Sequence, residues 1–282
     1  MSVVMKGSEV SAGMKPVLLA ELEALKARGI MPTLGIIRVG AKPDDLAYER
    51  GIMKRFEGLG LSVRVYEFPE DITQSDFNAS FTAINDDKDI HGILLFRPLP
   101  EGLSDEYARH IINPRKDVDC MSPENIAGVF AGNPDSFAPC TASGVMAMLN
   151  HYGYRLEGLN VVIVGRSMVV GRPLAMLMLG ANATVTICHT RTRNLAEICR
   201  KADVIIAAAG KARMITAEYV NENSIVVDVG INLDAEGKLC GDVDYNNIAP
   251  AVRAVSPVPG GAGAVTTSIL ARNVLKSAAM LV

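Results

Sequence analysis

The residues of this sequence with the clearest chemical potential lie between positions 161 and 180. Four apolar residues, 161–164, lead directly into Gly165, and Gly171 follows six positions later. The segment after Gly171 has the pattern of a helix, with Pro173 in its first turn. A buried parallel strand, a glycine turn and a helix N-terminus together can bind a phosphate, because the backbone N–H groups and the helix dipole favour negative charge. The spacing G-x-x-x-x-x-G departs from the usual G-x-G-x-x-G, so the pattern favours a nucleotide site and an ordinary turn equally.

The segment 187–193, at the end of the next apolar stretch, contains no acidic residue. An NAD site normally has Asp or Glu about 20 residues after the first glycine, where it binds the ribose 2′-hydroxyl. Here Thr190, Arg191 and Arg193 occupy that region, and hydroxyl and guanidinium groups suit a 2′-phosphate. Arg166 could add to the same site. The sequence therefore favours NADP over NAD, with a solvated helix start as the alternative, and His189 alone is more typical of a structural histidine.

A third unusual segment is 257–267, PVPGGAGAVTT. Two prolines followed by three glycines give a stiff approach and then backbone that a flat ligand can contact closely. The pattern alone fits a tight structural turn equally well.

Composition narrows the class of protein. The chain has 282 residues, 49% hydrophobic content and a net charge of −3, which favours a folded protein and gives no electrostatic reason to expect nucleic acid or an anionic membrane as partner. The five cysteines are scattered without a C-x-x-C pair, which argues against a metal cluster and against disulfides, and fits the cytoplasm. We expect no signal peptide, and no run of 18 apolar residues occurs.

The elements that must position these residues alternate along the chain. The predicted strands of the first half are 33–39, 61–68 and 90–96, and its predicted helices are 14–28, 43–59, 72–85 and 104–112. Such alternation is typical of βαβ units and a parallel sheet. After a helix at 141–152, a second series begins, with strands 161–164, 184–188, 204–208 and 225–229 and helices 172–180 and 193–201. This second series predicts a doubly wound nucleotide-binding domain.

Motifs along nearly the whole chain occur together in order. They are Val39-Gly40…Tyr48, Gly92-Ile93-Leu94…Pro98-Leu99-Pro100, Lys116-Asp117-Val118-Asp119, Pro139-Cys140-Thr141, Gly165-Arg166-Ser167-x-x-Val170-Gly171-x-Pro173, Asp228-Val229-Gly230-Ile231-Asn232, Gly241-Asp242-Val243 and Pro257-Val258-Pro259-Gly260-Gly261. In these motifs the sequence resembles the bacterial FolD type of 5,10-methylenetetrahydrofolate dehydrogenase/cyclohydrolase.

The resemblance implies an α/β fold of two domains with a cleft between them, and usually a homodimer. The expected N-terminal folate domain covers residues 1–140 and is joined by a C-terminal helix, 266–282. The expected Rossmann-like NAD(P)-binding domain covers residues 141–265.

The resemblance also implies the site residues. Tyr48 would stack on the folate ring system and Asp119 would hydrogen-bond the pterin, which makes these two the expected catalytic residues. The expected substrate-binding residues are Tyr48, Ile52, Phe96, Pro98, Leu99, Asp119, Pro259, Gly260, Gly261 and Thr266. The expected cofactor-binding residues are Thr141, Gly165, Arg166, Ser167, Val170, Gly171, His189, Thr190, Arg191, Ala209, Gly230 and Ile231.

Four positions depart from the family pattern. Ile52 replaces the family's lysine and Phe96 its glutamine, while Cys120 and Ala142 replace a glycine and a proline. Because neither Ile52 nor Phe96 can transfer a proton, we expect NADP-linked oxidation of methylenetetrahydrofolate to methenyltetrahydrofolate without the cyclohydrolase step.

Two alternatives to that expectation stay open. One is a bifunctional enzyme that uses Lys54 or Asp45, although Lys54 lies about 200° around the helix from Ile52. The other is a folate-binding paralogue without turnover.

Overall fold

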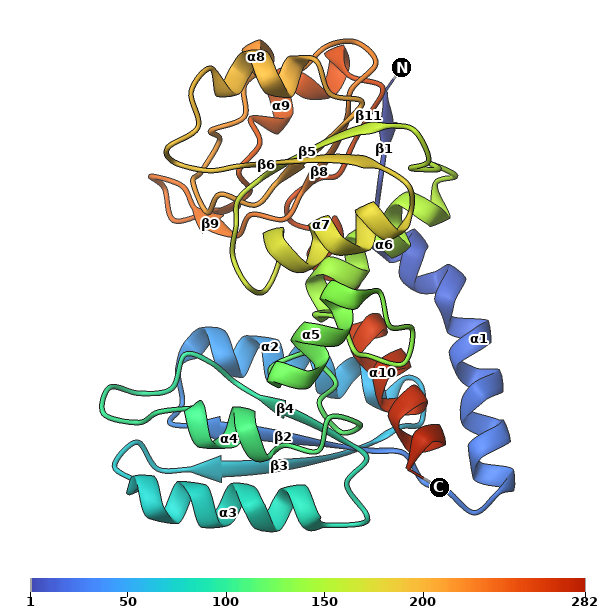
Figure 1. The fold of residues 1–282 in the computed structure, drawn as a ribbon, viewed down its shortest axis with the longest axis vertical. Coiled ribbons are helices and arrows are strands. Elements are labelled where there is room, and N and C mark those ends of the chain that lie inside the picture. Colours follow the sequence, from blue (N-terminus) through green and yellow to red (C-terminus); the bar gives the residue numbers. More distant parts are fainter. Residues whose placement is uncertain (1, 282) are drawn as a thin grey trace. The chain divides into compact units, whose positions relative to one another are not determined.

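The computed structural model describes residues 2–281, which divide into two compact units (Figure 1). Unit 1 comprises the residues up to Gly13 together with Thr141–Thr266, and unit 2 comprises Met14–Cys140 together with the chain from Thr267 onward. Met1 and Val282, the two ends of the predicted domains, lie outside the described residues.

Unit 2 is built on a three-stranded parallel sheet of order β3-β2-β4. Its strands are β2 (Thr33–Val39), β3 (Ser62–Phe68) and β4 (Gly92–Leu95). Its helices include α2 (Pro43–Glu57), α3 (Gln74–Asp86), α4 (Glu106–Ile111), α5 (Pro123–Ala131) and most of α10 (Thr266–Met280). Figure 1 shows α2 and α3 on opposite sides of this sheet.

The central strand β2 contributes side chains to the hydrophobic core of unit 2. All seven of its residues are buried, as expected for a parallel strand covered on both faces. Ile37 and Val39 belong to the core cluster that contains Phe77 and Phe81 of α3. The alternate residue Ile36 points to the other face, because successive side chains of a strand point in opposite directions.

Unit 1 is built on a six-stranded parallel sheet of order β1-β11-β8-β7-β5-β6. Its strands are β1 (Val3–Val4), β5 (Asn160–Val164), β6 (Thr184–Cys188), β7 (Val204–Ala207), β8 (Ile225–Asp228) and β11 (Ala254–Val255). Helix α7 (Gly171–Gly180) lies on one side of the sheet, and α8 (Leu195–Arg200) and α9 (Tyr245–Ile248) lie on the other (Figure 1). The doubly wound parallel sheet predicted from the sequence is confirmed.

The order of the strands creates a switch point. β5 pairs with β6 on one side and with β7 on the other. The strand that follows β5 in sequence is therefore added on one side of it, and the next strand, β7, is added on the opposite side. In open α/β sheets, ligands bind beyond the carboxyl ends of the strands at such a point.

Several elements differ from the prediction. Val3 and Val4, which the sequence analysis placed with residues 1–140, form β1 beside β11 within unit 1. Helix α1 (Gly7–Ala27) begins seven residues before the predicted start at position 14, so Pro16 lies inside the helix rather than in its first turn. Helix α5 was not predicted, because its nine residues follow a polar, turn-rich segment.

The remaining elements are one helix and a hairpin of two short strands. Helix α6 (Cys140–His151) follows unit 2 in the sequence, and β9 (Asn232–Leu233) pairs with β10 (Leu239–Cys240) in a small antiparallel hairpin. Across residues 2–281, no helix combines the length and the apolar character needed to cross a membrane.

Candidate functional site

The loops of unit 1 that carry the expected cofactor residues gather at one edge of its sheet. β5, β6, β7 and β8 run parallel and in register, with Val164 beside Cys188 and Ala207, and Ala207 beside Asp228. Because parallel strands end at the same edge, the segments that begin at Gly165, His189, Ala208 and Val229 follow one another there.

The turn between β5 and α7 requires glycine at two positions. Gly165 has φ 138°, and a Cβ at this residue would overlap the carbonyl oxygen of Ala208. A Cβ on Gly171 would overlap the carbonyl oxygen of Gly165. These contacts bring the first turn of α7 against the strand end, which is the role of glycine in dinucleotide-binding turns.

The N-terminus of α7 has the features of an anion site. No side chain caps it: the N-cap residue is Val170, whose N–H donates to Ser167 Oγ at 3.1 Å. The first N–H groups of a helix lack partners within the helix and carry partial positive charge. Arg166 and Ser167 are exposed beside this end.

The segment after β6 forms a tight turn in which His189 has a structural part. The His189 N–H donates to Thr192 Oγ1 at 2.9 Å, and His189 Nδ1 accepts from the Arg191 N–H at 3.1 Å. Thr190 and Arg191 are therefore held in an exposed turn at the edge where β5 ends. Among residues 2–281, no ion pair of the structure includes Arg166 or Arg191.

Two buried carboxylates fix the loops after β7 and β8. Asp242 accepts from the N–H groups of Ala209, Gly210 and Lys211 at 2.6, 3.0 and 2.8 Å. Asp228 accepts from the N–H groups of Gly230, Asp242 and Val243 at 2.9, 3.0 and 2.9 Å. Burial raises the pKa of Asp228 to about 6, although these N–H donors oppose the shift.

These two carboxylates position residues that the sequence analysis assigned to the cofactor, Ala209 and Gly230. The motifs that contain Asp228 and Asp242 carry the family resemblance, but neither side chain is among the expected site residues. The signal was present, since an aspartate beside glycine in a turn often accepts backbone N–H groups. Ile231, which follows, is 71% exposed.

The 257–267 segment, of which residues 257–266 belong to unit 1, is held by backbone contacts. The Val258–Pro259 peptide is cis, Gly260 has φ 98°, and the Gly260 carbonyl accepts from the Gly7 N–H at 2.8 Å. A Cβ on Gly261 would overlap the carbonyl oxygen of Pro257. Thr266 is only 8% exposed. The sequence pattern fits a structural turn and a binding loop equally well. In the structure, Gly260 and Gly261 are required by the backbone conformation itself, whether or not a ligand binds.

In unit 2, Tyr48 on α2 lies against Phe96, which follows β4. Their ring centroids are 5.6 Å apart with an interplanar angle of 32°. Burial raises the pKa of the Tyr48 phenol, with Cys140 and Asp119 adding to the shift, so this group is neutral near pH 7.

Ile52, an expected substrate-binding residue, is buried. Its side chain is 0% exposed and belongs to the core of unit 2, because it lies on the inward face of α2 together with Phe56. Its expected part in substrate binding stays a prediction. Phe96 is also largely buried, at 6% exposed, and contacts Tyr48 instead.

Asp119 lies at the end of a loop held by a dense hydrogen-bond network. Asp119 Oδ1 accepts from the Cys140 N–H at 2.8 Å, and burial raises the pKa of the Asp119 carboxyl. Asn273 of α10, which the sequence analysis did not single out, donates to the Val118 carbonyl at 2.9 Å. Asp117 accepts from the N–H groups of Met121 and Ser122 at 2.8 and 2.9 Å.

Pro98 and Leu99 follow β4 on a loop that also carries a cis peptide, Arg97–Pro98. Lys42 Nζ donates to the Pro98 carbonyl at 3.1 Å. Pro98 is exposed, whereas Leu99 packs partly against the core cluster beneath α3. Thr141, which is also expected to bind the cofactor, is half-buried in the first turn of α6.

Comparison with known proteins gives these features a common context. The model of the tetrahydrofolate dehydrogenase/cyclohydrolase catalytic domain matches residues 5–119, and that of the tetrahydrofolate dehydrogenase/cyclohydrolase NAD(P)-binding domain matches residues 139–281. The chain belongs to the tetrahydrofolate dehydrogenase/cyclohydrolase family. The family resemblance and the two-domain α/β fold expected from the sequence are thereby confirmed.

Individual members of this family match along their whole length. "Bifunctional protein FolD 1" of Desulfitobacterium hafniense is 51% identical over 277 residues, which cover 98% of this chain and 99% of the relative. The crystal structure of a bifunctional FolD from Campylobacter jejuni is 38% identical, with a TM-score of 0.96 and complete coverage of both chains. The FolD structure from Trypanosoma brucei, solved with NADP and an inhibitor, is 32% identical with a TM-score of 0.92 and covers 99% of this chain and 98% of its own.

Proposed function

We propose that this protein oxidises 5,10-methylenetetrahydrofolate with NADP and hydrolyses the methenyl product, as the names of its relatives describe for them. The observation that carries the proposal is the 51% identity with a bifunctional FolD over 98% of the chain. This support favours two activities over the dehydrogenase-only function expected from the sequence.

The oxidation step requires little of the protein beyond positioning. NADP supplies a nicotinamide C4 that accepts a hydride from the one-carbon unit. The chain's residues must hold donor and acceptor close together and exclude water, and no protein base is needed. The uncapped α7 N-terminus and the carboxylate-fixed loops of Ala209 and Gly230 suit the binding of the cofactor.

NADP is proposed over NAD because of Arg166, Thr190 and Arg191. These exposed groups lie where β5 and β6 end, and no acid in segment 187–193 competes for the ribose. A charge-assisted hydrogen bond contributes about 1.5–3 kcal/mol, so Arg191→Ala should raise the KM for NADP about ten- to a hundredfold. The KM for NAD, which lacks the 2′-phosphate, should change little. Equal effects on both cofactors would remove Arg191 from this role.

The hydrolysis step needs a group that takes a proton from the attacking water, and such a group contributes about 10²–10⁴-fold. Asp45 suits this better than Lys54. Seven residues of helix turn through about 700°, so Asp45 lies on the same face of α2 as Ile52, and it is three residues before Tyr48. Lys54 projects from a different face and is exposed.

A dehydrogenase without cyclohydrolase activity is the second candidate, and a specific observation favours it. Ile52 and Phe96 are buried and apolar at the two positions where the family has lysine and glutamine. Neither side chain can donate or accept a proton.

Two assays with purified protein separate these functions. Reduction of NADP with methylenetetrahydrofolate tests the oxidation, and its absence would leave only a folate-binding protein. Decay of added methenyltetrahydrofolate, compared with buffer, tests the hydrolysis.

For a bifunctional enzyme, the protein speeds methenyl decay and Asp45→Asn slows it by about 10²-fold or more. If wild-type decay equals the buffer rate, the dehydrogenase-only function holds. The double variant Ile52→Lys, Phe96→Gln should then gain hydrolysis.

We further propose that the protein is a cytoplasmic homodimer. The support is the family resemblance and the scattered, reduced cysteines, all of which are buried. Light scattering coupled to size-exclusion chromatography measures the oligomeric state directly.

A further inference from the structure

Arg97 lies beside the expected folate residues of unit 2, yet it is not one of them. It directly follows Phe96, whose ring lies against that of Tyr48. Its guanidinium carries a permanent positive charge and five N–H donors. The expected folate residues of this unit contribute aromatic rings, apolar groups and one carboxylate, so Arg97 adds a cationic donor that this set lacks.

The loop that carries Asp119 runs beside the strand that leads to Arg97. Ile93 of β4 pairs with Asp117 in a parallel bridge, and Asp119 follows two residues later. Because two residues span at most about 7 Å, Asp119 stays close to the end of β4, after which Arg97 follows. The two side chains are therefore brought together by the sheet and not by a mobile tail.

The charge of Arg97 acts on this loop. Burial raises the pKa of the Asp119 carboxyl, whereas the Cys140 N–H and the Arg97 guanidinium oppose that rise. Burial also raises the pKa of the Cys120 thiol, and the charge of Arg97 again opposes the rise. Both effects require the guanidinium to face the loop, since the interaction of two charges weakens with distance.

Both groups keep the capacity to bind a ligand. Within residues 2–281, the Arg97 guanidinium makes one hydrogen bond, from Nη1 to Asp105 Oδ2 at 3.4 Å. Most of its N–H donors are therefore available. Asp119 Oδ1 accepts from the Cys140 N–H, and in the same part of the chain Oδ2 pairs with no backbone N–H group and no cation.

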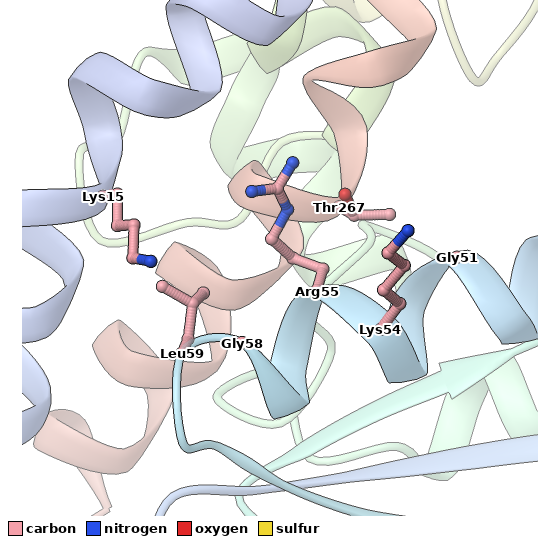
Figure 2. Close-up of a pocket in the computed structure, with 7 residues that line it drawn as sticks. All are labelled: Lys15, Gly51, Lys54, Arg55, Gly58, Leu59 and Thr267. Atoms are coloured by element: carbon pink, nitrogen blue, oxygen red, sulfur yellow. The ribbon is translucent and has the colours of Figure 1, made fainter.

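The basic side chains of α2 have a different location. Lys54 and Arg55 line a pocket of about 250 Å³ together with Lys15 of α1 (Figure 2). None of the expected folate residues lines that pocket. Arg97, in contrast, is a cation whose charge acts directly on Asp119.

We propose that Arg97 is a specificity-determining residue of the folate site, where it and Asp119 together recognise the 2-amino-4-oxo edge of the pterin. On that edge the 2-amino group and N3–H are donors, and the neighbouring 4-oxo oxygen is an acceptor. The Asp119 carboxylate accepts from the donors, and the Arg97 guanidinium donates to the oxygen. The inference rests on the proposed function, which brings a folate to Tyr48 and Asp119.

A carboxylate beside a guanidinium distinguishes pterins by the group at C4. A 4-amino group presents hydrogen atoms where the 4-oxo group presents lone pairs, so it cannot accept from Arg97. A site whose polar groups are left unpaired by the wrong ligand rejects that ligand strongly. Arg97 should therefore favour 4-oxo over 4-amino pterins.

The test measures the dissociation constants of tetrahydrofolate and of its 4-amino analogue, tetrahydroaminopterin, by calorimetry with the purified protein. The quantity compared is the constant of the 4-amino compound divided by that of tetrahydrofolate. Arg97→Met should lower this ratio about tenfold or more, the size of one charge-assisted hydrogen bond. Arg97→Lys keeps a charge and a donor and should retain part of the discrimination.

Arg64→Met is the matched control. Arg64 is also an exposed arginine of unit 2 in ion pairs, at 3.1 Å from Asp87 and 3.4 Å from Asp89. It lies on β3, which β2 separates from β4, so this variant should keep the ratio of the wild type. Asp105→Asn leaves the charge of Arg97 in place and weakens its ion pair, so the ratio should fall less than in Arg97→Met.

The outcomes are distinct. An unchanged ratio in Arg97→Met, with both affinities reduced equally, is the result of a purely structural part and overturns the proposal. An equal fall of the ratio in Arg64→Met overturns it as well. If the wild type binds neither compound, the proposed function itself fails, and the assignment of Arg97 fails with it.

Discussion

At the scale of single residues, Cys120 is the most unusual position in unit 2. It has φ 59°, in the left-handed region, and its side chain is 7% exposed. The family has glycine here, and the structure supplies the reason, since a residue with a Cβ is strained in this conformation. Cys120 directly follows Asp119, so this strain lies beside the expected pterin-binding carboxylate.

Replacing Cys120 by glycine and by alanine separates backbone strain from packing. Both changes remove the buried thiol, but only glycine relieves the left-handed strain. Cys120→Gly should therefore be more stable than Cys120→Ala by about 1 kcal/mol. Urea unfolding of the two variants measures the difference. An alanine variant as stable as the glycine variant would show that the loop relaxes around position 120.

The burial of individual side chains could not be predicted from the sequence. The family resemblance implies the same part, substrate binding, for Tyr48 and Ile52, which lie four positions apart on one helix. In the structure Ile52 is buried and Tyr48 is half-buried, because Tyr48 lies nearer the first turn of α2 and contacts Phe96. Burial depends on the depth of packing along a helix, which helical spacing does not reveal.

At the scale of elements, the loops after β7 and β8 depend on one buried carboxylate pair. Asp228 accepts three backbone N–H groups, and one of them is the N–H of Asp242. Asp242 in turn holds the loop of Ala209. The two loops are therefore fixed as a single network.

Asp228 gives this network a pH dependence. Its pKa in the folded protein is raised from the ordinary 3.8 to about 6, so the folded state binds the proton more tightly than the unfolded state. The stabilisation from this proton is complete below about pH 4 and is lost as pH rises through 6, a change of about 3 kcal/mol.

Asp228→Asn tests that dependence by removing the titration. The loss of stability between pH 4 and 7 should be smaller in the variant than in the wild type, as followed by urea unfolding at each pH. At pH 7 the variant should also be less stable than the wild type by about 1–3 kcal/mol, and by more at pH 4, because its amide would place an N–H donor against the Val243 N–H. Parallel pH profiles would place the titration on another group.

Elements with a strong pattern were predicted closely. β2 and β6 have the predicted bounds, and β5, β7 and β8 agree with the prediction to within one residue at each end, since short apolar runs rich in β-branched residues between polar or turn segments leave few alternatives. β1 and β11 were missed because each has only two residues. Such short strands are defined by their partner, and a partner about 250 residues away leaves no local signal.

At the scale of the whole molecule, each unit is assembled from two separate stretches of chain. Unit 1 combines the residues up to Gly13 with Thr141–Thr266, and unit 2 combines Met14–Cys140 with the chain after Thr266. The motifs of the family are spread in the same way. The folate residues expected from the resemblance belong to both units, with Tyr48 and Asp119 in one and Pro259 to Thr266 in the other.

The similarity to the family is a property of the whole chain, whereas the departures from it at Ile52 and Phe96 concern two side chains. Similarity over the whole chain supports two activities, while two buried side chains argue against one of them. Chemistry at one atom is decided locally, so the methenyl assay outweighs either consideration.

The pairing of β1 with β11 has a consequence for the protein's synthesis. The strand beside Val3 and Val4, Ala254–Val255, is synthesised about 250 residues later than they are. At about 5–20 residues per second, the first strand waits roughly 10–50 s for its neighbour. Throughout that interval Val3 and Val4 lack the strand with which they pair in the folded protein, so β1 can form only after nearly the whole of unit 1 has been made.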